Sequence, residues 1–275
     1  MRKIAATILL AALATSVQAG KVKGTVDKLT RLDCGTVHVN QLNAFSDTMS
    51  YPQQSRDLTS SCYLIQIGQA YMLWDTGLPA TAKDQPNDPS KPMSPTLRKT
   101  IVEQLAELGI KPEQIGLIGI SHYHFDHIGQ AADFPKAKLI IGAGDLAVMR
   151  KSEAVGKPVA NWLVEGAKVE GFDGDKDLFG DGSVTMLALP GHTPGHHGLL
   201  VKLPKTGAVL LSGDVAHFHE NLDSDGVPAF NTDRADSLAA MDRFRKLARS
   251  LKAVAIIQHD PRDIAKLPAF PAGAE

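Results

Sequence analysis

Hydrophobic residues in this chain form short runs separated by polar stretches that are rich in glycine and proline. Runs of three or more apolar or β-branched residues between such stretches predict β-strands. We expect strands at 21–32, 62–67, 71–74, 115–120, 139–141, 184–189, 198–201, 209–211 and 253–257. The run at 115–120 contains only isoleucine, leucine and glycine, which is typical of a strand buried on both faces.

Apolar residues at helical spacing predict two helices. The first should begin at Ser94-Pro95, with serine as the N-cap and proline as the first helical residue, and should end at Gly109. The second should span about 233–251. Strands therefore come first and then alternate with helices, which indicates a layered α/β fold with a mixed sheet. Five prolines at 79–95 predict a long loop, and no linker divides the chain.

The first 19 residues have the features of a secretory signal peptide. Arg2 and Lys3 precede an apolar run at 4–14, and residues 17–19 fit a small-residue cleavage site. The run is shorter than the ~20 apolar residues that cross a bilayer. We expect residues 1–19 to be removed and the remainder, 20–275, to form a single domain. The mature protein should be periplasmic or secreted, without membrane association.

Composition narrows the classes of function. Of the 275 residues, 43% are hydrophobic, which is enough for a large core and excludes a disordered chain. A net charge of −1 without a long basic run argues against nucleic acid as a partner. The two cysteines cannot form an all-cysteine zinc site. In an oxidising compartment Cys34 and Cys62 either form a disulfide or remain two buried thiols.

The segment 121–127 carries four potential metal ligands directly after a buried strand. His122 and His124 are two residues apart, so their imidazoles point the same way on an extended chain. Asp126 and His127 are adjacent, so their side chains diverge and can serve a second centre. Four such polar side chains are costly to bury unless a metal pairs them, and nitrogen with oxygen ligands suits zinc.

Three further apolar strands each end in a potential metal ligand. These ligands are His192, Asp214 and His259. Because ligands bind at strand ends in α/β sheets, we expect all three to converge with the segment 121–127. The sequence thus predicts a metal site built from four separate segments.

These motifs resemble those of the metallo-β-lactamase superfamily. The matching pieces are Asp75-Thr76-Gly77, His-x-His-x-Asp-His at 122–127, Pro-Gly-His-Thr-Pro-Gly-His at 190–196, Gly213-Asp214 and His259. They follow the family's order from about 60 to 260. The resemblance implies an α/β fold of the αββα-sandwich type and two divalent metal ions per chain, which we expect to be zinc.

The resemblance also assigns roles to individual residues. Asp214 would bridge the two ions, and Asp75 would orient ligand loops without binding metal. The ligands implied for one ion are His122, His124 and His192, and those for the other are Asp126, His127 and His259. His38, His196, His197 and His219 are expected to be structural or solvated.

Within the superfamily, the chain is most similar to the N-acyl-homoserine lactonases. The similar pieces are Cys-Tyr-Leu at 62–64, Asp-Thr-Gly-Leu-Pro at 75–79, the segment 121–127 and His259-Asp260. This similarity implies a small-molecule lactone or ester substrate. A hydroxide shared by two metal ions would attack the lactone carbonyl. Asp126 would deliver a proton to the leaving alkoxide.

One position departs from the lactonase pattern. Those enzymes often carry a tyrosine three residues after the bridging aspartate, where it contacts the substrate carbonyl, whereas this chain has His217. We expect His217 to donate a hydrogen bond in its place. Met49, Tyr51 and Phe125 are candidates for lining an acyl pocket.

Several alternatives share this ligand set. A phosphotriesterase of the methyl-parathion-hydrolase type uses the same seven ligands, and a thioesterase of the glyoxalase II type shares them. A β-lactamase fits secretion, but zinc β-lactamases generally lack an equivalent of Asp214. A metal-binding protein without catalysis is the alternative outside the enzymes. The sequence leaves the native metal, the acyl-chain preference and the oligomeric state open, a homodimer included.

Overall fold

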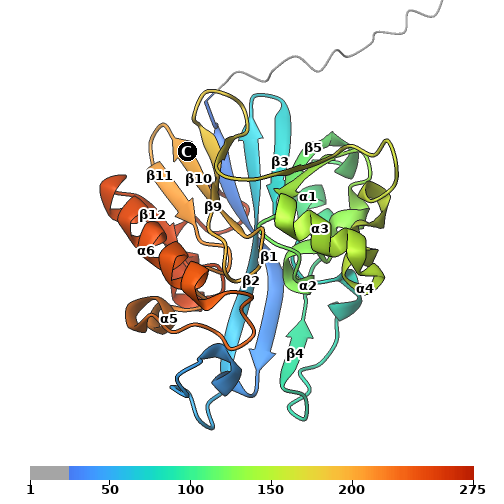
Figure 1. The fold of residues 1–275 in the computed structure, drawn as a ribbon. Helices are drawn as coiled ribbons and strands as arrows, with labels where there is room; N and C mark the ends of the chain where they lie inside the picture. Colours follow the sequence, from blue (N-terminus) through green and yellow to red (C-terminus); the bar gives the residue numbers. More distant parts are fainter. Residues whose placement is uncertain (1–24) are drawn as a thin grey trace, which may run out of the picture.

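The computed structural model describes residues 25–275, so the expected signal peptide at 1–19 lies outside the described residues. Two β-sheets pack face to face in the middle of the molecule, and helices cover their outer faces (Figure 1). This arrangement confirms the predicted αββα sandwich. No helix in the part of the chain that the structure describes is long and apolar enough to cross a membrane.

Both sheets are mixed, as the sequence predicts. The larger sheet consists of β1 (Lys28–Val39), β2 (Arg56–Ile67), β3 (Ala70–Trp74), β4 (Met93–Thr96), β5 (Ile115–Gly119), β6 (Lys138–Gly142) and β7 (Val169–Phe172). The smaller sheet consists of β8 (Lys176–Asp177), β9 (Val184–Ala188), β10 (His197–Leu203), β11 (Gly207–Leu211) and β12 (Val254–Ile256). The strand orders are β4-β1-β2-β3-β5-β6-β7 and β12-β11-β10-β9-β8. Strands β3, β5, β6 and β7 run parallel, whereas β1, β2 and β3 are antiparallel neighbours.

The α-helices of the described residues form two outer layers. They are α1 (Ile101–Glu107), α2 (Phe125–Ile128), α3 (Ala143–Lys151), α4 (Glu153–Gly156), α5 (His219–Ser224) and α6 (Arg234–Ser250). Helices α1 to α4 lie on the side of the larger sheet, and α5 and α6 lie on the side of the smaller sheet (Figure 1). Short 3-10 turns connect several elements, among them Leu42–Phe45 after β1 and Pro261–Lys266 after β12.

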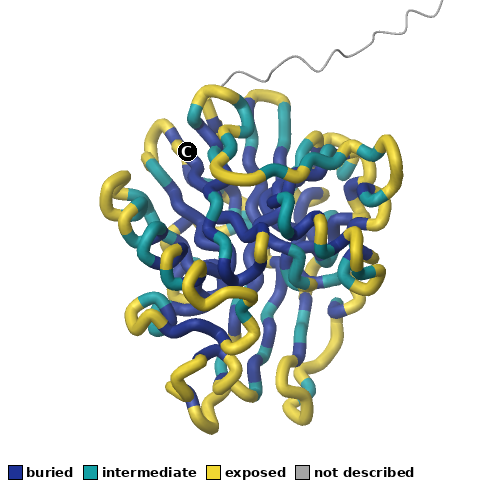
Figure 2. The backbone as a smooth tube through the Cα atoms, in the orientation of Figure 1, coloured by how far each residue is buried: buried dark blue, intermediate teal, exposed yellow. Residues whose placement is uncertain are grey.

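Side chains that point alternately to the two faces of each strand build the core between these layers. On β2, Tyr63 and Ile65 face the space between the sheets, while Leu64 faces the layer of α1. On β10, Leu199 faces the space between the sheets and Leu200 packs toward α6. Because neighbouring strand residues point to opposite faces, one strand serves two hydrophobic clusters. The buried backbone in the centre of the molecule follows from this pattern (Figure 2).

The predicted start of the first helix is wrong. Ser94 and Pro95 belong to β4, where they pair with β1, and proline is tolerated because β4 is an edge strand. The helix begins at Ile101 instead, with Thr100 as its N-cap in a capping box. The Thr100 hydroxyl accepts from the Glu103 amide, and the Glu103 carboxylate accepts from the Thr100 amide.

The first strand also differs from its prediction at 21–32. It begins at Lys28 and continues to Val39, and part of the predicted range lies outside the described residues. Its pairing with β2 shifts register between Asp33 and Thr36, where Gly35 has a φ of 110°. This bulge interrupts the alternation that marks a strand, so the pattern alone ends the strand too early. The second predicted helix is confirmed as α6, which begins after Asp233.

The two cysteines form a disulfide bond. Cys34 on β1 and Cys62 on β2 are both fully buried in the core beneath the larger sheet. Gly77, with a φ of 62°, lies against this disulfide, where any side chain would collide with Cys34. The disulfide therefore packs directly under the segment that carries Asp75.

Loss of this disulfide should lower the free energy of unfolding by about 3–4 kcal/mol. The bond links residues 28 positions apart. Cross-linking a loop of that length lowers the conformational entropy of the unfolded chain and so destabilises the unfolded state by about this free energy. Urea unfolding of the Cys34→Ala/Cys62→Ala variant and the oxidised parent, both loaded with the same metal, measures the difference. A difference below about 1 kcal/mol would contradict a stabilising role.

Candidate metal centre

The structure brings all seven predicted ligands together at one edge of the sandwich. Four of them, on three separate loops, have ligand atoms within 4.8 Å of one another, namely His122, His124, His192 and Asp214. The second group, Asp126, His127 and His259, meets the same limit. The segments that carry them follow β5, β9, β11 and β12, so strand ends deliver the ligands as expected.

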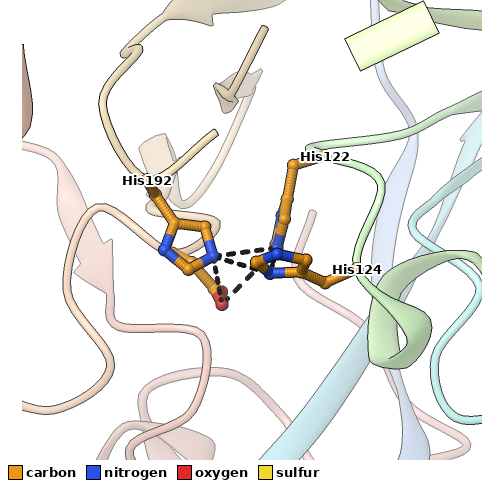
Figure 3. Close-up of side chains that lie close together, drawn as sticks. His122, His124 and His192 are labelled. Carbon is orange, nitrogen blue, oxygen red and sulfur yellow. Dashed lines mark hydrogen bonds and ion pairs between the residues drawn. The ribbon is translucent and has the colours of Figure 1, made fainter. Parts of the chain in front are cut away.

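The nitrogen atoms of the first group form a triangle (Figure 3). The His122 Nε2 lies 3.1 Å from the His192 Nε2 and 3.0 Å from the His124 Nδ1. The third side, between His192 and His124, is 2.9 Å. Each imidazole nitrogen has one proton or one lone pair in the ring plane, so three mutual contacts cannot all be hydrogen bonds. A divalent cation among the three nitrogens would satisfy every lone pair, so this donor set fits a metal.

Asp214 lies between the two groups with one oxygen toward each. Its Oδ2 is 3.4 Å from the His192 Nε2, whereas its Oδ1 is 3.0 Å from the His259 Nε2 and 3.3 Å from the His127 Nε2. The Oδ1 atom is buried and has no hydrogen-bond partner. Asp126 completes the second group, with its Oδ2 3.5 Å from the His259 Nε2. The cluster is therefore compatible with a dinuclear divalent metal site.

Hydrogen bonds on the far side of the rings fix which nitrogen faces the centre. In His127, His192 and His259 the outward Nδ1 lies within hydrogen-bond distance of an oxygen. The partners are the Asp75 Oδ2 at 2.9 Å for His127, the Asn231 Oδ1 at 2.8 Å for His192 and the Thr59 carbonyl at 2.7 Å for His259. Each acceptor places the proton on Nδ1, so Nε2 presents its lone pair to the centre.

Asp75 lies where the sequence places it, outside the ligand groups. Its fully buried carboxylate accepts hydrogen bonds from the amide and the hydroxyl of Ser121, at 2.7 and 2.9 Å. The third contact is the one with His127. Asp75 therefore ties the start of the ligand segment to one of its histidines.

Burial and charge divide the histidines into two sets. Burial holds the pKa of His122 and His192 well below its usual value, so both rings are neutral, the form that binds metal. Burial opposes protonation of His127 and His259 too, but the nearby carboxylate of Asp214 raises the pKa of both. The pKa of Asp214 would rise on burial, yet the surrounding histidines hold it well below its usual range. The carboxylates thus favour positive charge at the second group, and a bound cation would take the place of the protons on the Nε2 atoms of His127 and His259.

The remaining histidines lie outside the two groups, as predicted. His196 accepts a hydrogen bond from the Asp214 amide at 2.7 Å, and its Nδ1 lies 2.8 Å from the Leu189 carbonyl, so it positions Asp214. The others contact neighbouring groups: His38 with Asp57, His197 with the Gly195 and Gly174 carbonyls, and His219 with Asp263.

His217 is buried beside the cluster, with 4% of its surface exposed. Its Nε2 lies 3.2 Å from the Asp214 Oδ2, and its Nδ1 has no hydrogen-bond partner. The ring stacks on His259, with centroids 5.5 Å apart, and meets the edge of Phe45 at 4.8 Å. His217 therefore lies against the ligand cluster and not in solvent.

A pocket of about 200 Å³ opens directly onto the cluster. It is lined by Val37, Phe45, Leu58, Met93, His124, Phe125, Asp126, Asp214, His217, Phe230 and His259. Of the three residues expected to line an acyl pocket, only Phe125 is among them. Tyr51 packs in the core against Phe218, and Met49 is 84% exposed.

Sequence reasoning missed several residues that hold the ligands in place. Asp145 on α3 is fully buried, and its carboxylate accepts hydrogen bonds from the Gly195 amide at 2.7 Å and the Thr193 hydroxyl at 2.8 Å. Burial raises the pKa of Asp145 to about 7. The residue thus fixes the turn that follows His192. No sequence motif marks Asp145 or Asn231, because the partners of both residues are distant in sequence.

The chain matches a known protein family over most of its length. The model of the Metallo-beta-lactamase superfamily matches residues 55–259. The N-acyl homoserine lactonase AttM of Azorhizobium caulinodans is 31% identical over 172 residues, which is 58% of this chain and 64% of that protein. The chain thus aligns with slightly less than two thirds of this relative. An N-acyl homoserine lactonase of a Bacillus species is 28% identical over 247 residues, 86% of this chain and 94% of that protein.

A solved structure has the same fold over nearly its whole length. The crystal structure of a quorum-quenching N-acyl homoserine lactone hydrolase superimposes with a TM-score of 0.78 at 26% identity. The match covers 90% of this chain and 98% of that one.

The Asp145→Ala variant should bind metal more weakly at the group that contains His192. It removes both anchors of the turn at 193–195, whereas Asp145→Asn can still accept from Gly195 and donate to Thr193. We expect the alanine variant to lose one metal ion per chain to a competing chelator about tenfold more readily than the asparagine variant. Elemental analysis after graded chelation measures this. Equal retention by both variants would contradict the anchoring role.

Proposed function

The chain belongs to the metallo-β-lactamase superfamily, and within it we propose a dinuclear metal hydrolase that opens the lactone ring of N-acyl homoserine lactones. The observation that carries the proposal is the position of the apolar pocket, which opens directly onto the Asp214 bridge. A lactone with an apolar tail needs an apolar pocket and a metal cluster in one site. The names of the two relatives support this choice of substrate.

The residues of the site have separable tasks in this reaction. Two divalent ions, which we expect to be zinc, would supply a nucleophilic hydroxide near neutral pH and a Lewis acid for the carbonyl when bound. His122, His124 and His192 would hold one ion, Asp126, His127 and His259 the other, and Asp214 both. The apolar pocket walls exclude water from the ring and orient the carbonyl toward the cluster.

Two residues at the pocket surface are assigned to the substrate itself. Asp126 lines the pocket and remains partly exposed, so its carboxylate can carry a proton to the ring oxygen as the ring opens. His217 lines the pocket with its Nε2 toward the cluster, 3.2 Å from the Asp214 Oδ2, and this nitrogen would donate a hydrogen bond to the carbonyl oxygen, where negative charge develops.

We also propose that the mature protein begins after residue 19 and acts in the periplasm or outside the cell. The buried disulfide supports this, because such bonds persist in oxidising compartments. N-terminal sequencing of the protein from its native host tests the proposal, and recovery with Met1 intact would contradict it.

The most direct test of the function is hydrolysis by the metal-loaded protein of three substrates from one preparation. These are an acyl-homoserine lactone, a chromogenic cephalosporin and paraoxon. We expect kcat/KM for the lactone to exceed the other two by at least about 100-fold, since only the lactone suits both the pocket and the cluster. Turnover of paraoxon or cephalosporin with an inert lactone would reject the proposal in favour of another hydrolase.

The His124→Ala variant should lose activity while keeping its fold. The three-nitrogen triangle then lacks one ligand, but the hydrophobic clusters of the sandwich do not include this side chain. We expect turnover to fall at least about 1,000-fold and the circular dichroism spectrum to stay unchanged. Elemental analysis should show one weakly held ion in the variant and two ions in the parent. Full activity or full metal content in the variant would contradict the ligand assignment.

The His217→Ala variant should lower kcat/KM on lactones about tenfold, the loss of one hydrogen bond worth about 1–2 kcal/mol. The His217→Tyr variant should retain most of the activity, because a phenol also donates a hydrogen bond. Steady-state kinetics on several lactones measures both. If His217→Ala matched the parent on every lactone cleaved, the residue would have no substrate contact.

A further inference from the structure

A buried carboxylate that the proposed reaction does not use directly follows the ligand His259. The Asp260 side chain is 1% exposed, and both of its oxygens accept hydrogen bonds. Its Oδ1 accepts from the Arg262 Nε at 2.8 Å and from the Arg262 amide at 3.0 Å. Its Oδ2 accepts from the Arg262 Nη2 at 2.5 Å and from the His219 amide at 3.0 Å. Among the described residues, Arg262 is the cation paired with this buried charge.

Arg262 also contacts helix α5. Its Nη1 donates to the Glu220 Oε1 at 3.0 Å and its Nη2 to the Glu220 Oε2 at 2.8 Å, a paired geometry that a planar guanidinium fits and an ammonium does not. Glu220 accepts a further hydrogen bond from the Arg56 Nη1 at 2.8 Å, at the start of β2. The hydrogen bonds from Arg262 lower the pKa of Glu220 to about 2, so its carboxylate is charged at neutral pH. We call Arg56, Glu220, Arg262 and Asp260 the ion-pair network.

The ion-pair network joins the segments that carry His217 and His259. Asp260 follows His259 directly, and the His219 amide that it binds lies two residues after His217. The third segment is the start of β2. There the Thr59 amide donates to the His259 carbonyl at 3.0 Å, and the Thr59 carbonyl lies 2.7 Å from the His259 Nδ1. Each of the three segments is therefore bonded to the other two.

The two rings that these segments carry are stacked and share the Asp214 carboxylate. The ring centroids of His217 and His259 are 5.5 Å apart, with an angle of 11° between the planes. The His217 Nε2 lies 3.2 Å from the Asp214 Oδ2, and the His259 Nε2 lies 3.0 Å from the Asp214 Oδ1. Movement of one segment against the other would therefore change the distance from Asp214 to a metal ligand or to the residue assigned to the substrate carbonyl.

We propose that Arg262 is a positioning residue, which holds His259 in place against His217 through the ion-pair network. Arg262 belongs to neither ligand group and does not line the pocket. Solvent weakens its half-exposed pair with Glu220, but the pair with Asp260 has a buried partner. Without the guanidinium, Asp260 is a buried anion with no paired cation, so the segment that carries His259 must rearrange. The inference rests on the proposed lactonase function for its effect on turnover, and deepens it.

Metal retention separates position from charge. Removal of the Arg262 cation strengthens the attraction of the site for a divalent ion, so a purely electrostatic role predicts tighter binding by Arg262→Ala. Loss of position predicts the opposite. We expect Arg262→Ala to release one of its two ions to a chelator about tenfold more readily than the parent. Arg262→Lys can still pair with Asp260 and should stay within about threefold of the parent. Graded chelation followed by elemental analysis measures both, and equal or tighter retention by Arg262→Ala would overturn the inference.

Steady-state kinetics of the metal-saturated proteins test the same role in the reaction. With N-hexanoyl homoserine lactone we expect Arg262→Ala to lower kcat about tenfold and to leave KM within about twofold, because the pocket lining is intact. The matched control is Arg245→Ala. Arg245 holds the other end of α5, through the Leu222 carbonyl and Asp225, and pairs with no member of the ion-pair network. It should keep the parent's kcat and metal retention, and losses equal to those of Arg262→Ala would overturn the inference.

Glu220→Gln keeps Asp260 paired and weakens only the link to α5. It should lower kcat about threefold, and it tests the inference even if Arg262→Ala does not fold. Parent-like kcat in Glu220→Gln, or a raised KM with unchanged kcat in Arg262→Ala, would overturn the positioning role. A parent that binds two ions and leaves the lactone intact would contradict the proposed function instead, and metal retention would still decide the role of Arg262.

Discussion

The carboxylate of Asp214 is buried between two groups of imidazoles, with one oxygen facing each group. A buried anion is stable only when opposite charge or hydrogen bonds compensate it, and its Oδ1 has no hydrogen bond. The arrangement of the loops follows from this requirement. His196 fixes the Asp214 backbone, and each facing histidine is oriented by an acceptor on its far side.

The sandwich tolerates a buried polar cluster because the hydrophobic core that stabilises the fold lies elsewhere. Alternating strand residues fill the space between the sheets and the layers beneath the helices, and none of these clusters needs a ligand side chain. Loops at the strand ends are therefore available to carry polar groups. The buried disulfide beneath residues 75–77 and the Asp145 contact beneath residues 193–195 stiffen two of these loops. Rigid support of this kind holds ligand atoms at fixed separations.

Much of the fold and of the ligand set could be predicted from the sequence because the relevant signals are local. His122 and His124 share a face through their spacing, and the apolar run before them marks a buried strand. The helix start after Thr100 could not be distinguished from Ser94-Pro95, because both sequences fit an N-cap and only pairing with β1 decides. Asn231 and Asp145 were missed because their partners are 39 and about 50 residues away. Contacts of that range depend on how the layers pack, which periodicity does not encode.

The measurement that most directly tests this account is the anomalous scattering of a crystal grown from the metal-loaded protein. The account predicts two peaks per chain, one on each side of Asp214, about 3.5–4 Å apart and next to the apolar pocket. A single peak, or peaks that do not share Asp214, would contradict the central role proposed for the Asp214 carboxylate.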